Sequence, residues 1–272
     1  MKNCFAGLAW LLIASSAASL EKAPWFGDVY EFDLYTAFSY SQYSRIDSAL
    51  VQPEYSYNNY VNDVAFGVTL TEAIDLELEM NLARTPHQTY GFRSAALQLR
   101  YLILNDTSGD PLSLTVGLNT RGVTSRAVRD VSSPYASYWN GEFTTSLGKE
   151  WIKKSSWIMR GFAFGSLGLA NHGSFWNQYL VSIEGKFRQK QSLEFFSRGY
   201  FGYGSEVEVD IEGFKGWGFI RHSSIDVGAK YCYRPTFWGT LSLSYACRLW
   251  AQSFPKGEQY IEFSYNLPFS AL

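Results

Sequence analysis

The feature that most constrains this chain is an alternation of apolar and polar residues that recurs along its length. The clearest example is AIDLELEMNL, residues 73–82, where Ile74 and Leu78 share one parity and Asp75 and Glu79 share the other. Successive side chains of a strand point to opposite faces, so this stretch predicts a strand with one apolar and one polar face.

Twelve segments show the alternation, and no helical periodicity competes with them. They are residues 30–42, 58–70, 73–84, 94–105, 112–122, 138–149, 156–169, 177–188, 192–203, 223–234, 237–249 and 259–269. Each has the ~10 residues that a tilted membrane-spanning strand requires. We therefore expect an all-β fold, a single antiparallel up-and-down transmembrane β-barrel of about twelve strands over residues 20–272. Ten or fourteen strands are the alternatives, since residues 204–222 also alternate in part.

The connections between these segments differ in length in a regular way. Short links such as TEA, DTSGD and RQKQ alternate with mostly longer ones such as SRIDSALVQPEYSYNN. Outer-membrane barrels have tight periplasmic turns and long outer loops, so the pattern supports a barrel with both chain ends on the periplasmic side.

Aromatic residues help to separate this fold from a soluble β-sandwich or jelly roll, which would also alternate. They make up 18% of the chain, and they stand at the ends of the apolar rows, as Tyr30, Tyr40, Trp139, Tyr233 and Phe269 do. Amphipathic rings at both ends of a strand are typical of a lipid-exposed band at its two interfaces.

The first nineteen residues, MKNCFAGLAWLLIASSAAS, have the layout of a secretory signal peptide. A lone Lys2 precedes a short apolar run, and small residues follow, so we expect cleavage near Ala18 or Ser19. The apolar run is shorter than the ~20 residues of a spanning helix, which disfavours the alternative of a membrane anchor. The mature protein should therefore be exported as residues 20–272.

The last predicted strand, within GEQYIEFSYNLPF, carries a resemblance. Its apolar row ends in an aromatic residue, Phe269, and it resembles the C-terminal strand of Gram-negative outer-membrane β-barrel proteins, the generic porin-like class. The resemblance implies a place in the bacterial outer membrane, contact with outer-membrane lipid, and recognition of residues 259–269 by the barrel-assembly machinery.

The polar parity of the strands carries the charges. It predicts a charged lumen, because an Arg or Lys facing lipid is unfavourable by ~2–4 kcal/mol at mid-membrane. On the first three predicted strands every inward charge is acidic, and all the inward bases lie on later strands. The pore-lining candidates are Glu31, Asp33, Asp63, Asp75, Glu77, Glu79, Arg100, Arg121, Arg160, Arg198, Lys230 and Arg248. The distribution predicts an acidic wall facing a more basic one.

Two interpretations of that lumen remain open. The first is a narrow channel for small polar solutes, which the opposed walls of charge would select. The second is a lumen closed by interlocking charges or by a loop, in a structural protein or an adhesin that acts through its outer loops.

An enzyme is a third hypothesis, based on NHGSFWNQY, residues 171–179. The spacing of His172 and Ser174, followed by Asn177, resembles a fragment of the outer-membrane phospholipase A and lipid A deacylase pattern. That resemblance implies Ser174 as nucleophile, His172 as base and Asn177 as the residue that orients the ring. An ordinary loop between two strands is the favoured interpretation, so we expect no enzyme and no catalytic residues.

Several other classes of function have no support in the sequence. The net charge of -2 offers no basic surface for nucleic acid. Neither the histidines nor the cysteines have metal-ligand spacing, and no glycine-rich phosphate loop follows a strand. We therefore expect no metal site and no cofactor.

Overall fold

The computed structural model describes residues 20–153, 156–188, 190–235 and 239–270. The predicted signal peptide, residues 1–19, lies outside the described residues. Among the described residues, no helix combines the length and the apolar character needed to cross a membrane.

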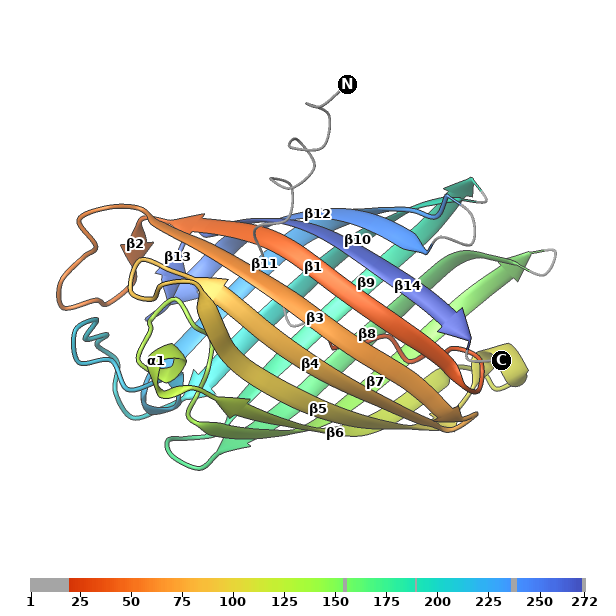
Figure 1. Ribbon diagram of the computed structural model, residues 1–272, viewed down its shortest axis with the longest axis horizontal. Coiled ribbons are helices and arrows are strands. Elements are labelled where there is room, and N and C mark those ends of the chain that lie inside the picture. The colour runs from red at the N-terminus through yellow and green to blue at the C-terminus, as the bar shows by residue number, and fades with distance from the viewer. Residues whose placement is uncertain (1–19, 154–155, 189, 236–238, 271–272) are drawn as a thin grey trace, which may run out of the picture.

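Twelve antiparallel strands close into one barrel, in which each strand pairs with its neighbours in the sequence and the first pairs with the last (Figure 1). The strands are β1 (Glu31–Tyr43), β3 (Tyr57–Thr71), β4 (Ile74–Arg84), β5 (Gly91–Leu104), β6 (Ser113–Val123), β7 (Trp139–Lys153), β8 (Ser156–Ala170), β9 (Trp176–Arg188), β10 (Gln191–Tyr203), β11 (Arg221–Tyr233), β12 (Thr240–Gln252) and β14 (Gln259–Ser270). The prediction of an all-β, up-and-down barrel is confirmed. The alternatives of ten and fourteen strands are wrong.

The fourteen-strand alternative is wrong because residues 204–220 form no barrel strand. They contain only a short 3₁₀ turn, η2 (Trp217–Phe219), and isolated bridges such as Glu206 to Ile220.

The polar backbone groups of a membrane-spanning sheet must all be paired, and closure of β1 against β14 removes both sheet edges.

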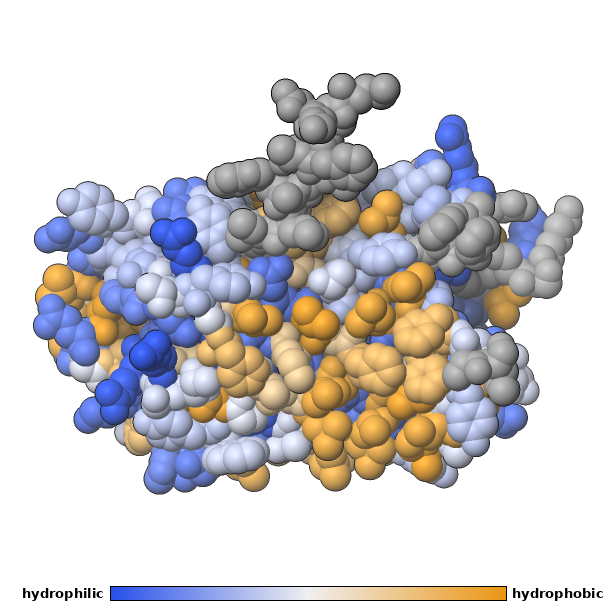
Figure 2. Space-filling view, viewed as in Figure 1, coloured by the Kyte–Doolittle hydropathy of each residue, from blue (hydrophilic) through white to orange (hydrophobic). Residues whose placement is uncertain are grey.

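The two faces of the barrel wall follow the predicted parity. On β4, Leu78 and Met80 are 42% and 47% exposed. The alternating residues Glu77 and Glu79 are only 6% and 1% exposed. Figure 2 shows apolar side chains gathered on the outer face of the barrel. The apolar row of AIDLELEMNL therefore faces outward and its acidic row faces the lumen.

The two ends of the barrel differ. At the turn end, where β1 begins and β14 ends, adjacent strands are joined by short turns, one of which contains η1 (Asp106–Ser108). At the loop end, longer connections carry the helical turn α1 (Ser125–Val128) and a two-stranded ribbon of β2 (Arg45–Ile46) and β13 (Pro255–Lys256). Figure 1 shows α1, β2 and β13 together at one end, away from the C-terminus.

Candidate functional site

Residues 20–27, which precede β1, fold back into the lumen from the turn end; we call this segment the plug. Its Pro24 is among the fully buried side chains, and Leu20 is 5% exposed. A barrel of this size leaves space that side chains of the wall alone do not fill, and here the chain's own N-terminal segment occupies it.

The plug is fastened at the turn end by Trp25 and Asp106. The indole nitrogen of Trp25 donates a hydrogen bond of 3.0 Å to Asp106, which lies in η1. The same carboxylate accepts hydrogen bonds from the backbone N–H of Glu150 at 2.6 Å and from the hydroxyl of Ser113 at 2.5 Å. Burial alone would raise the pKa of Asp106, but these hydrogen bonds lower it below its ordinary value.

The ring of Trp25 rests on inward-facing groups of β7 and β8. It meets Phe162 edge to face, with ring centroids 6.1 Å apart, and the guanidinium of Arg160 lies 5.3 Å from its centroid. Gly148 provides the space for the plug, because a Cβ at that position would lie 2.7 Å from Cγ of Pro24.

The middle of the plug is held through its backbone carbonyl groups. Arg100 donates a hydrogen bond of 2.7 Å to the carbonyl oxygen of Ala23 and pairs with Asp75 at 2.8 Å. The hydroxyl of Ser146 donates to the carbonyl oxygen of Lys22 at 2.6 Å. These contacts are made to backbone atoms, so they depend on the course of the chain and not on its side chains. They also satisfy polar groups that would otherwise be buried without partners.

The deepest part of the plug reaches the acidic row of β4. The backbone N–H of Glu21 donates to Glu77 at 2.8 Å, and the backbone nitrogen of Leu20 lies 3.2 Å from a carboxylate oxygen of Glu79. Glu79 also pairs with Arg121 of β6 at 2.6 Å. The start of the plug is thus seated against carboxylates.

The loop end carries a second assembly, the cap, formed by the loops at residues 44–56, 124–138, 204–220 and 253–258. These loops and the adjoining strand ends contribute to an apolar cluster around Trp217 that includes Ile46, Val131, Val209 and Phe254. Trp217 is 0% exposed. A cluster of this kind gives the loops a small core of their own.

Backbone hydrogen bonds join the loops of the cap to each other. The N–H of Trp217 donates to the carbonyl oxygen of Tyr135 at 3.0 Å, and that of Gly218 donates to Ala136 at 3.1 Å. The N–H of Ser174, in the loop between β8 and β9, donates to the carbonyl oxygen of Gly218 at 2.7 Å. The loop that follows β8 is therefore tied to the cap.

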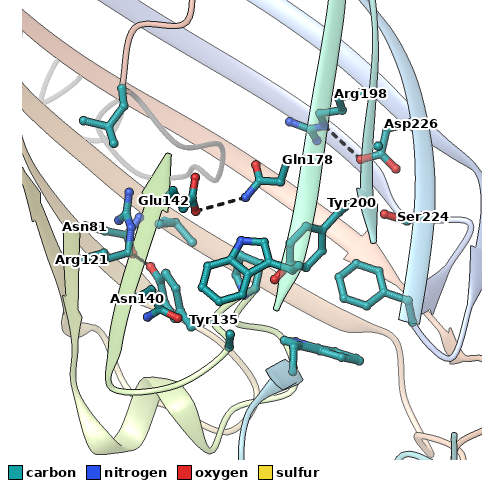
Figure 3. Close-up of a pocket in the computed structure, with 18 of the residues that line it drawn as sticks. Asn81, Arg121, Tyr135, Asn140, Glu142, Gln178, Arg198, Tyr200, Ser224 and Asp226 are labelled. Carbon is teal, nitrogen blue, oxygen red and sulfur yellow. Dashed lines mark hydrogen bonds and ion pairs between the residues drawn. The ribbon is translucent and has the colours of Figure 1, made fainter. Parts of the chain in front are cut away.

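Between the plug and the cap lies a cavity of about 220 Å³, which we call the chamber. The plug contributes Leu20 and Lys22 to its lining, and the cap contributes Trp217 and Phe254. Figure 3 shows its wall, where the rings of Tyr135 and Tyr200 lie among amides and charged groups. The labelled residues of this wall are Asn81, Arg121, Tyr135, Asn140, Glu142, Gln178, Arg198, Tyr200, Ser224 and Asp226.

The structure places the predicted pore-lining residues on the inner side of the wall. Asp63, Asp75, Glu77, Glu79, Arg100 and Arg248 are buried, and Glu31, Asp33, Arg121, Arg160, Arg198 and Lys230 are half-buried. The acidic strands β1, β3 and β4 are contiguous in the barrel. Their role in lining an open pore stays a prediction.

The inward bases lie beside acids. Arg160 pairs with Glu184 on the next strand at 2.5 Å, and Arg198 and Arg248 both pair with Asp226, at 3.0 and 2.7 Å. Lys230 lies opposite Glu194 in the register of β10 and β11. These cross-strand pairs neutralise charge locally.

Sequence reasoning missed the plug and the aromatic part of the chamber. Trp25 stands in the unpatterned stretch EKAPWFGD, which has no periodicity from which to place it. A signal did exist on β8, where Phe162 and Phe164 share the inward parity of Arg160. Both face the plug: Phe162 contacts Trp25, and the ammonium of Lys22 lies 5.5 Å from the ring centroid of Phe164.

The suggested catalytic residues lie in and after the loop between β8 and β9. Within the described part of the chain, no hydrogen bond between the side chains of His172 and Ser174 is found. Asn177 accepts a hydrogen bond of 2.6 Å from the hydroxyl of Tyr203 instead of orienting an imidazole. In the same described part, no group of three or more His, Cys, Asp or Glu is placed to hold a metal ion.

Comparison with solved structures supports the fold. The COG4313 outer membrane channel from Pseudomonas putida F1 is similar with a TM-score of 0.67 and 12% identity, covering 94% of this chain and 100% of that one. The Acinetobacter baumannii outer membrane protein Omp33 is similar with a TM-score of 0.50 and 8% identity, covering 88% and 98% of the two chains. No protein-family model and no curated protein matches the sequence. The chain therefore has the fold of an outer-membrane β-barrel.

Proposed function

We propose that this protein is a gated channel for small polar solutes in the bacterial outer membrane, and that the structure represents its closed state. The observation that carries the proposal is the chamber between the plug and the cap, whose wall includes hydrogen-bonding groups. A barrel that served only as a scaffold would have no need of a cavity with hydrogen-bonding groups such as Asn140 and Gln178 on its wall.

The plug has the properties of a removable part. Its backbone contacts are hydrogen bonds, worth ~0.5–1.5 kcal/mol net between neutral groups and ~1.5–3 kcal/mol where the partner is charged. A displaced plug would leave water to replace them. The cross-strand ion pairs, by contrast, join residues of the wall to each other, so these pairs stay intact when the plug leaves.

The solute class follows from the chamber lining. Tyrosine rings, amides and paired charges can bind neutral or zwitterionic solutes through hydrogen bonds without a net charge on the wall. The cavity of about 220 Å³ limits the solute to a small molecule. A narrow passage of this kind selects by size and hydrogen bonding.

Liposome swelling tests the proposal. A variant that lacks residues 20–27 should admit small sugars and amino acids faster than the wild-type barrel, with a cut-off at larger sugars. Trp139→Ala, a change of an outward side chain that is 62% exposed, is the matched control and should swell as the wild type does. If liposomes with the plugless barrel swell no faster than protein-free liposomes, the channel is excluded.

The same assay distinguishes the channel from the alternative, a closed-lumen barrel that acts through its outer loops. That alternative expects no permeability after removal of the plug, because the cap and the wall would still close the lumen. The lipid-hydrolase hypothesis stays a prediction; phospholipid or lipid A turnover that is lost in Ser174→Ala would support it, and turnover that persists would remove it.

A further inference from the structure

Two neighbouring carboxylates meet the backbone nitrogens of the first two residues of the plug. The backbone nitrogen of Leu20 lies 3.2 Å from Glu79, and the next backbone nitrogen, of Glu21, lies 2.8 Å from Glu77. Leu20 and Glu79 are 5% and 1% exposed, so the junction is buried. Glu77 and Glu79 are successive inward residues of β4 and present their oxygens to one place in the lumen.

The charges at this place do not balance. Arg100 pairs with Asp75, and Arg121 pairs with Glu79. In the described ranges, no ion pair joins Glu77 to a basic side chain. A peptide N–H at Leu20 would supply one hydrogen and no charge, whereas an ammonium would supply three hydrogens and a positive charge. Buried carboxylates are stable where a cation and hydrogen bonds accompany them.

The sequence offers a way to create that ammonium. Small residues, Ala17 and Ser19, stand three and one positions before Leu20, as expected for cleavage of the Ser19–Leu20 bond. Hydrolysis breaks the bond between the carbonyl carbon of Ser19 and the nitrogen of Leu20. Water gives its hydroxyl to the Ser19 carboxyl group and its proton to the Leu20 amine, which takes up a second proton in neutral solution.

We propose that Glu77 and Glu79 form a binding site for the α-ammonium group of the exported chain, and that Leu20 is its first residue. Removal of the signal peptide then does more than release the chain, because it creates the cation that seats the plug. The inference concerns the plug alone, and it stands whether or not the barrel conducts.

The first test is the N-terminal sequence and intact mass of the protein isolated from outer membranes. The proposal expects a chain that begins at Leu20. A chain that begins at Ser19 or at any other residue overturns it, because the nitrogen beside Glu79 would then be a neutral amide.

The second test measures the reactivity of the α-amine. An acylating reagent used near pH 7 modifies α-amines, with an ordinary pKa of ~8, ahead of lysines, and mass spectrometry of the N-terminal peptide gives the rate. The folded wild type should react at least tenfold more slowly than the denatured protein. Equal rates in the folded and denatured protein would overturn the proposal.

Variants assign the protection to the carboxylates. Glu77→Gln should speed acylation in the folded barrel several-fold, while Glu194→Gln, the same change at a β10 acid that accepts a hydrogen bond from Ser182, should leave the rate unchanged. Heat-modifiable migration checks that each variant is folded. Unchanged protection of the α-amine in a folded Glu77→Gln variant would overturn the proposed site. If that variant does not fold, the N-terminal sequence and the acylation rates of the folded and denatured wild type still test the proposal.

Discussion

The indole nitrogen of Trp25 lies 3.0 Å from a carboxylate oxygen of Asp106, although the two residues are 81 positions apart in the sequence. Trp25 precedes the first strand, and Asp106 lies in the turn between β5 and β6. This contact fixes the point at which the plug enters the barrel, so changes at either residue should act on the closure of the lumen.

Trp25→Phe should loosen the plug without unfolding the barrel. The ring contact with Phe162 can persist, but the hydrogen bond to a charged acceptor, worth ~1.5–3 kcal/mol, is lost. We expect at least a tenfold rise in the ratio of open to closed states in single-channel recordings. Trp139→Phe, on the outer face, is the control. Equal ratios in the Trp25 variant and the wild type would show that this contact does not hold the plug.

Asp106 should make the stability of the turn end depend on pH. Its pKa is lowered in the folded protein, so its stabilising contribution is present above the ordinary value of 3.8 and is lost as the pH falls through the lower folded value. Asp106→Asn should therefore reduce the unfolding free energy at pH 7, and the difference from the wild type should shrink below about pH 4. Denaturant unfolding at several pH values measures this. A difference that stays constant down to pH 2 would contradict the assignment.

Arg248 should contribute far more to stability than Lys256. Arg248 pairs with Asp226 and Glu258 at 2.7 Å each, with side chains of 5–8% exposure, and its removal leaves buried charge without a partner. Arg248→Gln should reduce the unfolding free energy by about 3–5 kcal/mol. Lys256, whose side chain is 49% exposed in its ion pair with Asp47, is the control at the surface. Lys256→Gln should change the unfolding free energy by at most about 1 kcal/mol. Similar losses in the two variants would contradict this ranking.

Gly173, in the loop between β8 and β9, should be a structural residue at the contact of that loop with the cap. Its φ is +92°, and a Cβ there would lie 2.6 Å from the carbonyl carbon of Gly218. Gly109 has φ +112°, and a Cβ at that position would have no atom within 4 Å. Gly109→Ala therefore measures the backbone strain alone, about 1–2 kcal/mol. Gly173→Ala should be the more destabilising change and should increase protease cleavage of the outer loops. Equal effects of the two substitutions would show that the close approach to Gly218 has no weight.

The strands of this barrel could be predicted because their signal is local. On β4 the side chains of Leu78 and Glu79 report opposite faces through parity alone, whatever the rest of the chain does. The same rule placed the charges inside. It could not say which acid each base would contact, because pairs such as Arg121 of β6 with Glu79 of β4 depend on how far the side chains reach across the intervening strand.

The plug and the cap could not be predicted, because they depend on long-range contacts of segments without periodicity. The cap packs Ile46 and Phe254 against Trp217, from three separate loops, and the plug places Trp25 against Phe162. Loops carry no repeating pattern that ties one to another, so only the folded chain shows that they meet.

If residues 20–27 close a channel, planar-bilayer recordings of the refolded barrel with and without these residues should differ. The wild-type barrel should be mostly closed, and the truncated barrel should conduct steadily, with a charge selectivity that shifts on Glu77→Gln. Equal conductance of the two proteins, or no conductance in either, would contradict this proposal.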